Sequence, residues 1–219
     1  MAAATELQYR SPSAAAPALE EADPLRARTW SLLASLLRQP PEPTMLGALG
    51  ASDSAAASDA RPLAVAWRGL RDAALTADAA AVDDEFHDLF IGLGRGELVP
   101  YASWYRTGFL MNRPLVALRR DLAMLGFVRS PEVREPEDHA SAVAEVMAML
   151  ADPAGAHDAS TQALFFREHV DGWMPALFAD LRNARSADFY VAVATLGEAF
   201  VDFERTWLDT SAGSRVSRT

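Results

Sequence analysis

Three acids and a histidine stand together in the run Glu135-Pro136-Glu137-Asp138-His139. Carboxylates so close in the chain can hold guanidinium or N–H groups of a ligand through charge-assisted hydrogen bonds. A histidine beside carboxylates is expected to keep its proton to a higher pH, and therefore to donate a hydrogen bond. The same run also suits a helix start at Pro136, because acids there complement the positive end of the helix dipole. Spacing alone favours this structural interpretation.

A second stretch concentrates aromatic side chains upstream of this run. Its candidate binding residues are Tyr101, Ser103, Trp104, Tyr105 and Phe109. Aromatic residues at helical spacing usually belong to a core, but neighbours on a helix point about 100° apart and cannot share one narrow apolar stripe. Tyr and Trp are also enriched at binding hot spots. We expect Ser103 to cap a short helix here, and the stretch is a candidate binding surface.

Catalytic and metal-binding alternatives find less support in the residue pattern. Asp84 and His87 have the spacing of one di-iron ligand pair, but such bundles need a second pair and two further glutamates. The sequence contains no Cys and no Gly-x-Ser-x-Gly motif. The glycines of residues 92–96 resemble a phosphate-binding loop only in composition. We therefore predict no catalytic residues and no metal ligands, with a helical-bundle enzyme or metalloprotein as the alternative.

Composition limits the possible partners. The 219-residue chain has a net charge of −10 and a pI of about 4.8. Such acidity disfavours nucleic acid, which needs a basic surface, and favours basic partners such as arginine-bearing peptides. No apolar run is long enough for a transmembrane helix, so membrane insertion is not expected. The N-terminus lacks the pattern of a signal peptide, and we expect a cytoplasmic protein.

The elements that must position these residues are all predicted to be helices. Leucines and aromatics recur at helical spacing, alanine is abundant, and no segment alternates as a strand would. The prediction is an all-α protein with one globular domain of roughly eight to eleven helices over residues 21–209. Residues 1–20 are expected to be a disordered tail and residues 210–219 a frayed end. A first helix is expected to begin at Asp23-Pro24.

Several motifs in their order resemble one known family. They are Leu89-Phe90-Ile91-Gly92, Tyr101-Ala102-Ser103-Trp104-Tyr105, Glu135-Pro136-Glu137-Asp138-His139 and the segment from Phe165 to Phe178. Together they look like the TorD/DmsD family of cytoplasmic chaperones for molybdoenzymes, and the resemblance covers about residues 24–208. This sequence departs from the family pattern at Asp171-Gly172, which precede Trp173 where Pro is common.

The resemblance implies a function and a set of contacts. Family members bind the twin-arginine signal peptide, and sometimes the body, of the catalytic subunit of a molybdopterin-containing oxidoreductase until its cofactor is inserted. Carried over by position, Glu135 and Asp138 would meet guanidinium groups, Trp104 and Tyr105 the apolar part of the peptide, and His139 would donate a hydrogen bond. The two motifs, including Pro136, would form facing walls of one groove.

The resemblance also carries two weaker implications. Some relatives bind GTP weakly or form domain-swapped dimers, so either a monomer or a swapped dimer is expected. No cofactor is expected, because no motif in this sequence supports nucleotide binding. A general helical adaptor with another protein client remains the other alternative.

Overall fold

The computed structural model describes residues 15–52, 59–92, 96–130, 134–155 and 157–216, and within these ranges every regular element is helical. This confirms the all-α prediction. The α-helices are α1 (Ala15–Arg38), α2 (Pro43–Gly50), α3 (Pro62–Thr76), α4 (Ala79–Phe86), α5 (Ala102–Thr107), α6 (Arg113–Met124), α7 (Ala140–Ala151), α8 (Ala159–His169), α9 (Met174–Arg182) and α10 (Phe189–Val216). A π-helical turn, η1 (His87–Ile91), extends α4. No helix in the described ranges has the length and apolarity that crossing a membrane requires.

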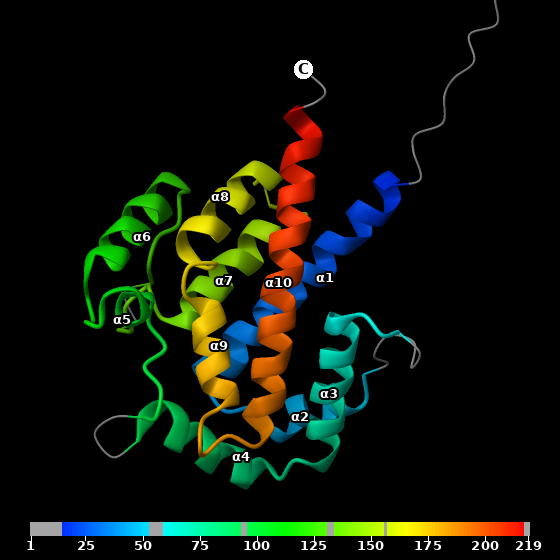
Figure 1. The fold of residues 1–219 in the computed structure, drawn as a ribbon, viewed down its shortest axis with the longest axis vertical. Helices are drawn as coiled ribbons and strands as arrows, with labels where there is room; N and C mark the ends of the chain where they lie inside the picture. Colours follow the sequence, from blue (N-terminus) through cyan, green and yellow to red (C-terminus); the bar gives the residue numbers. More distant parts are fainter. Residues whose placement is uncertain (1–14, 53–58, 93–95, 131–133, 156, 217–219) are drawn as a thin grey trace, which may run out of the picture.

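The helices are arranged around α10, which runs through the middle of the molecule (Figure 1). α1 crosses it and packs closely along α7, while α8 and α9 lie on one side of α10 and α3 on the other. α4 covers one end, and α5 and α6 form the outer edge farthest from α3 (Figure 1). The first and last helices therefore meet in the interior, and α6 lies at the periphery.

The contact between α1 and α10 combines an apolar pair with a buried ion pair. The rings of Trp30 and Phe200 meet edge to face, with centroids 4.9 Å apart. One turn away, Arg26 binds Glu204 in a bidentate pair, with Nε–Oε1 and Nη2–Oε2 distances of 2.6 and 2.9 Å. Both side chains are almost fully buried, at 1% and 0% exposure. The Arg26 guanidinium also lies 3.9 Å from the ring centre of Trp207, which adds a cation–π contact.

Two further features fix the end of the molecule that carries α4. Glu85 accepts hydrogen bonds from the backbone N–H groups of residues 188–190 at the start of α10, at 2.7–3.1 Å. Burial raises the pKa of this carboxyl, and the three N–H donors oppose that effect. Gly96 lies so close to η1 that a Cβ there would be 2.5 Å from the carbonyl carbon of Phe90. Only glycine fits this close approach of two backbone segments.

The two terminal helices extend beyond their predicted bounds. α1 begins at Ala15 rather than at Asp23, so Pro24 lies inside the helix. α10 continues to Val216, past the expected frayed start at residue 210. Alanine is the strongest helix former, and the alanine-rich sequence on the N-terminal side of Pro24 favours helix there. The rest of the predicted tails, residues 1–14 and 217–219, lies outside the described residues.

Candidate functional site

The two predicted motifs are joined through their backbones. Tyr101 and His139 form an isolated antiparallel bridge. The N–H of Ala102 donates to the carbonyl of Asp138 at 2.9 Å, and the N–H of Ala140 donates to the carbonyl of Pro100 at 2.8 Å. The Tyr101 and His139 rings also meet edge to face, with centroids 5.0 Å apart. The start of α5 is therefore held against the start of α7.

Asp138 completes this junction by capping α5. Its Oδ2 accepts the backbone N–H of Ser103 at 2.9 Å, and Asp138 is only 1% exposed. The prediction that Ser103 caps a helix is wrong, because α5 begins at Ala102 and the buried Ser103 lies within it. Its hydroxyl instead accepts the N–H of Asn112 at 3.2 Å. Ser103 and Asp138 thus position α5 from beneath the surface rather than presenting groups to a ligand.

His139 is the N-cap of α7, so the helix begins at Ala140 and not at Pro136 as predicted. Its Nδ1 accepts the N–H of Ser141 at 3.2 Å and lies 2.7 Å from the Ser141 hydroxyl. Burial, together with the positive charge of Arg38, lowers the pKa of His139 to about 4. The expectation of a protonated histidine is therefore wrong, because loss of water outweighs the nearby carboxylates. Such an imidazole is also a weak general base near neutral pH.

This lowered pKa predicts a pH-dependent stability. A histidine neutral in the folded state and titrating normally when unfolded stabilises the fold above about pH 6.5, and this contribution is lost as the pH falls toward 4. We expect the difference in unfolding free energy between the protein and His139→Asn to change by up to about 3 kcal/mol across this window. Asn preserves the capping acceptor. Urea denaturation at pH 4.5 and 7 measures the change, and an equal difference at both values would contradict it.

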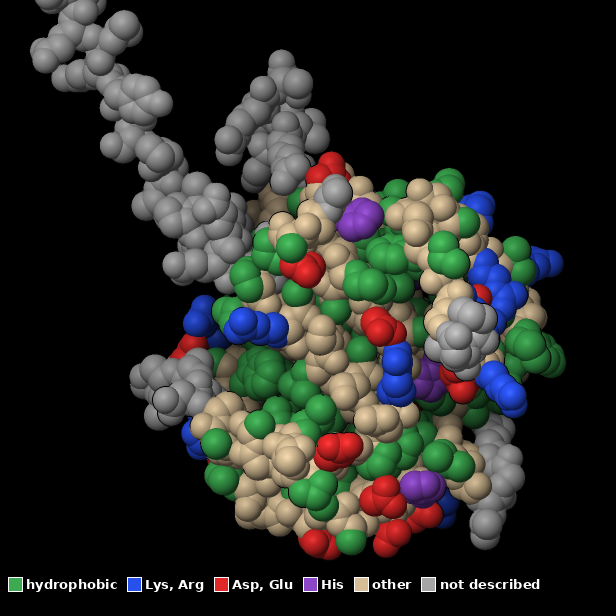
Figure 2. All heavy atoms as spheres, turned by 180° about the vertical axis from the view of Figure 1, so that it is seen from behind, with side chains coloured by type: hydrophobic (Ala, Val, Ile, Leu, Met, Phe, Trp, Pro, Cys, Tyr) green, Lys and Arg blue, Asp and Glu red, His purple; other side chains and the backbone are tan. Residues whose placement is uncertain are grey.

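A groove of about 580 Å³ opens beside this junction, between α6, the segment after it and α7. Its apolar lining comes from Leu122, Ala123, Phe127, Val128, Ala142, Val146 and Met149. Of the predicted residues, Glu135 and His139 line it. Figure 2 views the molecule from behind and shows acidic and basic side chains interspersed among apolar ones. The face seen in Figure 2 is therefore mixed in charge rather than uniformly acidic.

The charged groups of the groove are mostly paired with one another. Glu137 pairs with Arg119 at 2.8 Å and with Arg129 at 3.7 Å. Glu145 pairs with Arg38. Glu135 differs, since within the described ranges it forms no ion pair and accepts a hydrogen bond from the Tyr101 hydroxyl. Partial burial disfavours the charged form of Glu135 and so raises its pKa. A cation bound beside this carboxylate would therefore stabilise its negative charge.

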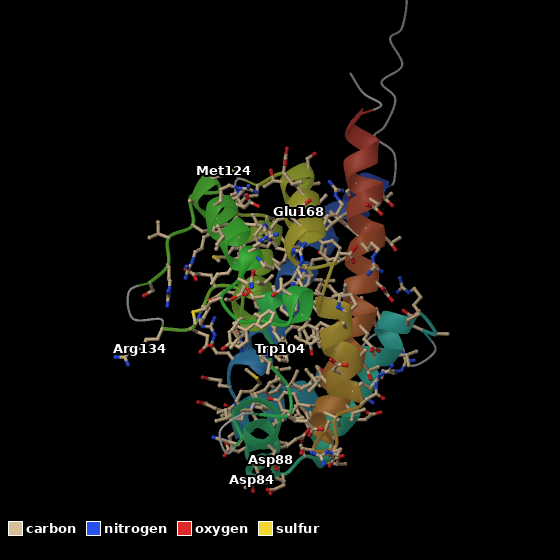
Figure 3. The ribbon with its side chains drawn as sticks, turned by 60° about the vertical axis from the view of Figure 1, so that its left-hand side comes forward. Asp84, Asp88, Trp104, Met124, Arg134 and Glu168 are labelled. Atoms are coloured by element: carbon tan, nitrogen blue, oxygen red, sulfur yellow. The ribbon has the colours of Figure 1, made fainter. Side chains whose placement is uncertain are left out.

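The aromatic motif does not line the groove. The Tyr105 hydroxyl donates to Asp180 at 2.9 Å, and its ring packs near that of Trp173, which attaches α5 to α9. Trp104 is half-buried on α5, well apart from Arg134 in Figure 3. Phe109 is 69% exposed in the turn before α6. The backbones of the two motifs are thus neighbours, but Glu135 lines the groove whereas Trp104, Tyr105 and Phe109 do not.

Most of the residues that line the groove escaped prediction from sequence. They include residues of α7, Leu122 of α6 and Phe127. The sequence of α7 contains a signal that could have indicated an exposed apolar surface, because Glu145 is the one charged residue among its 12. In the structure, Met149 of this helix is 43% exposed. A helix apolar on nearly every side has more apolar surface than one core contact covers. Among the described residues, no group of three His, Asp or Glu side chains is placed to hold a metal ion.

Comparisons with known proteins bear on this arrangement. The chain matches the model of the nitrate reductase delta subunit family over residues 56–179. It is 31% identical over 134 residues to the chaperone protein TorD of Vibrio cholerae serotype O1, which is 57% of this chain and 61% of that protein. It is 26% identical over 153 residues to TorD of Shewanella piezotolerans, covering 65% and 70% of the two chains. The match thus spans less than two thirds of the Vibrio protein.

A likeness to a solved structure accompanies these matches. The crystal structure, from Archaeoglobus fulgidus and described there as a proposed redox enzyme maturation protein, is 16% identical, with a TM-score of 0.46. It covers 94% of this chain and 99% of that one. The family model, which matches more than half of the chain, and the TorD relatives confirm the resemblance found in the sequence: the chain belongs to the nitrate reductase delta subunit family, the family of the TorD chaperones.

Proposed function

We propose that this protein is a maturation chaperone for a molybdopterin-containing oxidoreductase, and that its groove binds the twin-arginine signal peptide of the catalytic subunit. Relatives named TorD chaperones support the class of function. The protein would hold its client in the cytoplasm during cofactor insertion and release it for export. This role needs binding and no chemical step, in keeping with the low basicity of His139 beside Ser141.

The observation that carries the proposal is the state of Glu135. It is the groove carboxylate that the described arginines leave without an ion pair, whereas Glu137 and Glu145 already have guanidinium partners. A peptide guanidinium can therefore reach Glu135 without first breaking an ion pair. The second arginine of the signal would exchange with Arg119 at Glu137, at little net change in charge pairing.

The apolar lining matches the rest of such a signal. A twin-arginine peptide continues into an apolar stretch, and Leu122, Phe127 and Val146 offer it contact in the same groove as Glu135 and Glu137. Burial of this stretch would supply affinity, while the carboxylates would bind the arginines. The groove is in this way suited to an amphipathic segment rather than to a purely cationic one.

Calorimetry with three synthetic peptides tests the proposal. The first carries Arg-Arg before the apolar stretch of a molybdoenzyme signal, and the others replace the pair with Lys-Lys or Gln-Gln. We expect the Gln-Gln peptide to bind roughly tenfold or more weakly, and the Lys-Lys peptide to be intermediate because lysine lacks the planar two-donor geometry. Equal affinity for the Arg-Arg and Gln-Gln peptides, or no binding of either, would refute the proposal.

A further inference from the structure

α6 carries a second apolar surface, next to the groove and made of other residues. Arg113, Val116, Ala117, Arg120 and Met124 recur every three or four residues and form what we call the outer face of α6. Val116 is 67% and Met124 73% exposed. A shallow hollow of about 510 Å³ lies along this face and is completed by Met111 and Asn112.

The outer face is distinct from the groove described above. The α6 residues that line the groove are Arg119, Leu122 and Ala123. At 100° per residue, Ala117 and Leu122 point about 140° apart around the helix axis, whereas Val116 and Ala123 point within about 20° of each other, two turns apart along the helix. α6 lies at the edge of the molecule in Figure 1, and Figure 3 shows Met124 at the end of this helix farthest from α4. The groove and the hollow along the outer face have no lining residue in common.

The core does not account for the apolar residues of the outer face. α6 already buries Leu115 and Leu118 on its inner side, at 3% and 2% exposure. Met111, which is 74% exposed, adds to the same surface from the preceding turn. Its φ of 52° lies in the left-handed region, which is uncommon for a residue with a side chain. Exposed apolar side chains gathered on one helix face and flanked by polar residues are typical of interaction sites.

The charge of this face selects the partner. The chain as a whole carries a charge of −10, yet both charged members of the outer face are arginines. Arg120 pairs with Asp121 at 2.8 Å, whereas the side chain of Arg113 has no ion pair within the described part of the chain. Screening limits surface charge effects to about 8 Å at physiological salt, so Arg113 and the Arg120–Asp121 pair set the charge of this face rather than the distant acids.

We propose that the outer face of α6 docks an acidic amphipathic helix of a partner protein. Its apolar residues would rest on Met111, Val116 and Met124, and its carboxylates would meet Arg113 and Arg120. The 12 residues of α6 span about 18 Å, so three turns of partner helix cover the face. This inference goes beyond the proposed signal-peptide binding and does not depend on it, because no residue of the groove takes part.

Fluorescence anisotropy with a labelled 14-residue helical peptide tests this docking on the full chain. The peptide has leucine on one face and glutamate on the other, and its two comparison peptides carry glutamine or lysine in place of glutamate. We expect the glutamate peptide to bind at least tenfold more tightly than the lysine peptide. Its affinity should fall as salt rises, and an excess of unlabelled twin-arginine peptide should not displace it.

Two variants locate the contact. Val116→Glu places a like charge in the apolar stripe and is expected to weaken binding of the glutamate peptide at least tenfold. Leu164→Glu, at a 57% exposed position on α8, is the matched control and should leave binding unchanged. Equal loss in both variants, or tight binding of the lysine peptide, would overturn the proposal. So would Val116-dependent binding to phosphatidylglycerol vesicles without binding of the glutamate peptide, since the face would then be a lipid site.

Discussion

Replacing Glu204 with Ala is expected to lower the free energy of unfolding by about 3–5 kcal/mol, since it leaves the buried guanidinium of Arg26 without its carboxylate. The remaining cation–π contact with Trp207 offsets only part of that cost. Small domains are stable by about 5–15 kcal/mol, so the variant should approach the limit of folding. Urea denaturation followed by circular dichroism measures the change as a lower midpoint.

A control variant compares this buried ion pair with a surface ion pair that also involves a glutamate of α10. Glu198 of α10 lies 3.4 Å from Arg182 at a partly exposed position, and Glu198→Ala should cost less than about 1 kcal/mol. The double variant Arg26→Met with Glu204→Leu should recover most of the lost stability, because apolar residues of similar size can replace a buried ion pair. Comparable losses of unfolding free energy for Glu204→Ala and Glu198→Ala would show that the buried ion pair contributes no more to stability than the surface pair.

Glu135→Gln is expected to weaken binding of a twin-arginine peptide while leaving stability nearly unchanged. A charge-assisted hydrogen bond contributes about 1.5–3 kcal/mol, which corresponds to roughly ten- to hundredfold in dissociation constant. The amide keeps the shape and can still accept the hydrogen bond of Tyr101, so the local fold should persist. Calorimetry with the Arg-Arg peptide measures the loss, and the Gln-Gln peptide should be insensitive to the substitution.

Glu145→Gln provides the matched control within the same groove. Its carboxylate is already paired with Arg38, so its removal should change peptide affinity by less than about threefold. If Glu145→Gln weakens binding as much as Glu135→Gln, the peptide responds to overall groove charge and the assignment of Glu135 fails. Unfolding midpoints of both variants, measured alongside, exclude a general loss of structure.

Helix identity could be predicted from the sequence because it depends on local spacing. Leu115 and Leu118 at a separation of three residues indicate the buried side of α6, and both are buried. Gly126 at the expected helix end adopts a φ of 81°. Helix boundaries were less predictable where a distant residue supplies the cap. Asp138 caps a helix 35 residues upstream, and no window around Ser103 contains that information.

The site was less accessible to sequence reasoning because it depends on direction as well as proximity. The motifs around Tyr101 and His139 meet through their backbones. The Tyr105 hydroxyl, however, binds Asp180, and Tyr105 does not line the groove. The prediction that His139 is protonated failed for a related reason. Sequence displays its acidic neighbours but not the burial that lowers its pKa. Burial and side-chain direction both arise from packing between segments far apart in the chain.

The meeting of α1 with α10 has a consequence for synthesis of the chain. Arg26 and Glu204 are separated by 178 positions, so this buried ion pair cannot form until α10 emerges. At about 5–20 residues per second, synthesis of the 178 positions between Arg26 and Glu204 takes roughly 9–36 s. The nascent protein thus passes through a long interval in which its own first helix is an exposed amphipathic segment. The interior between α1 and α10 is therefore completed only once α10 has been synthesised.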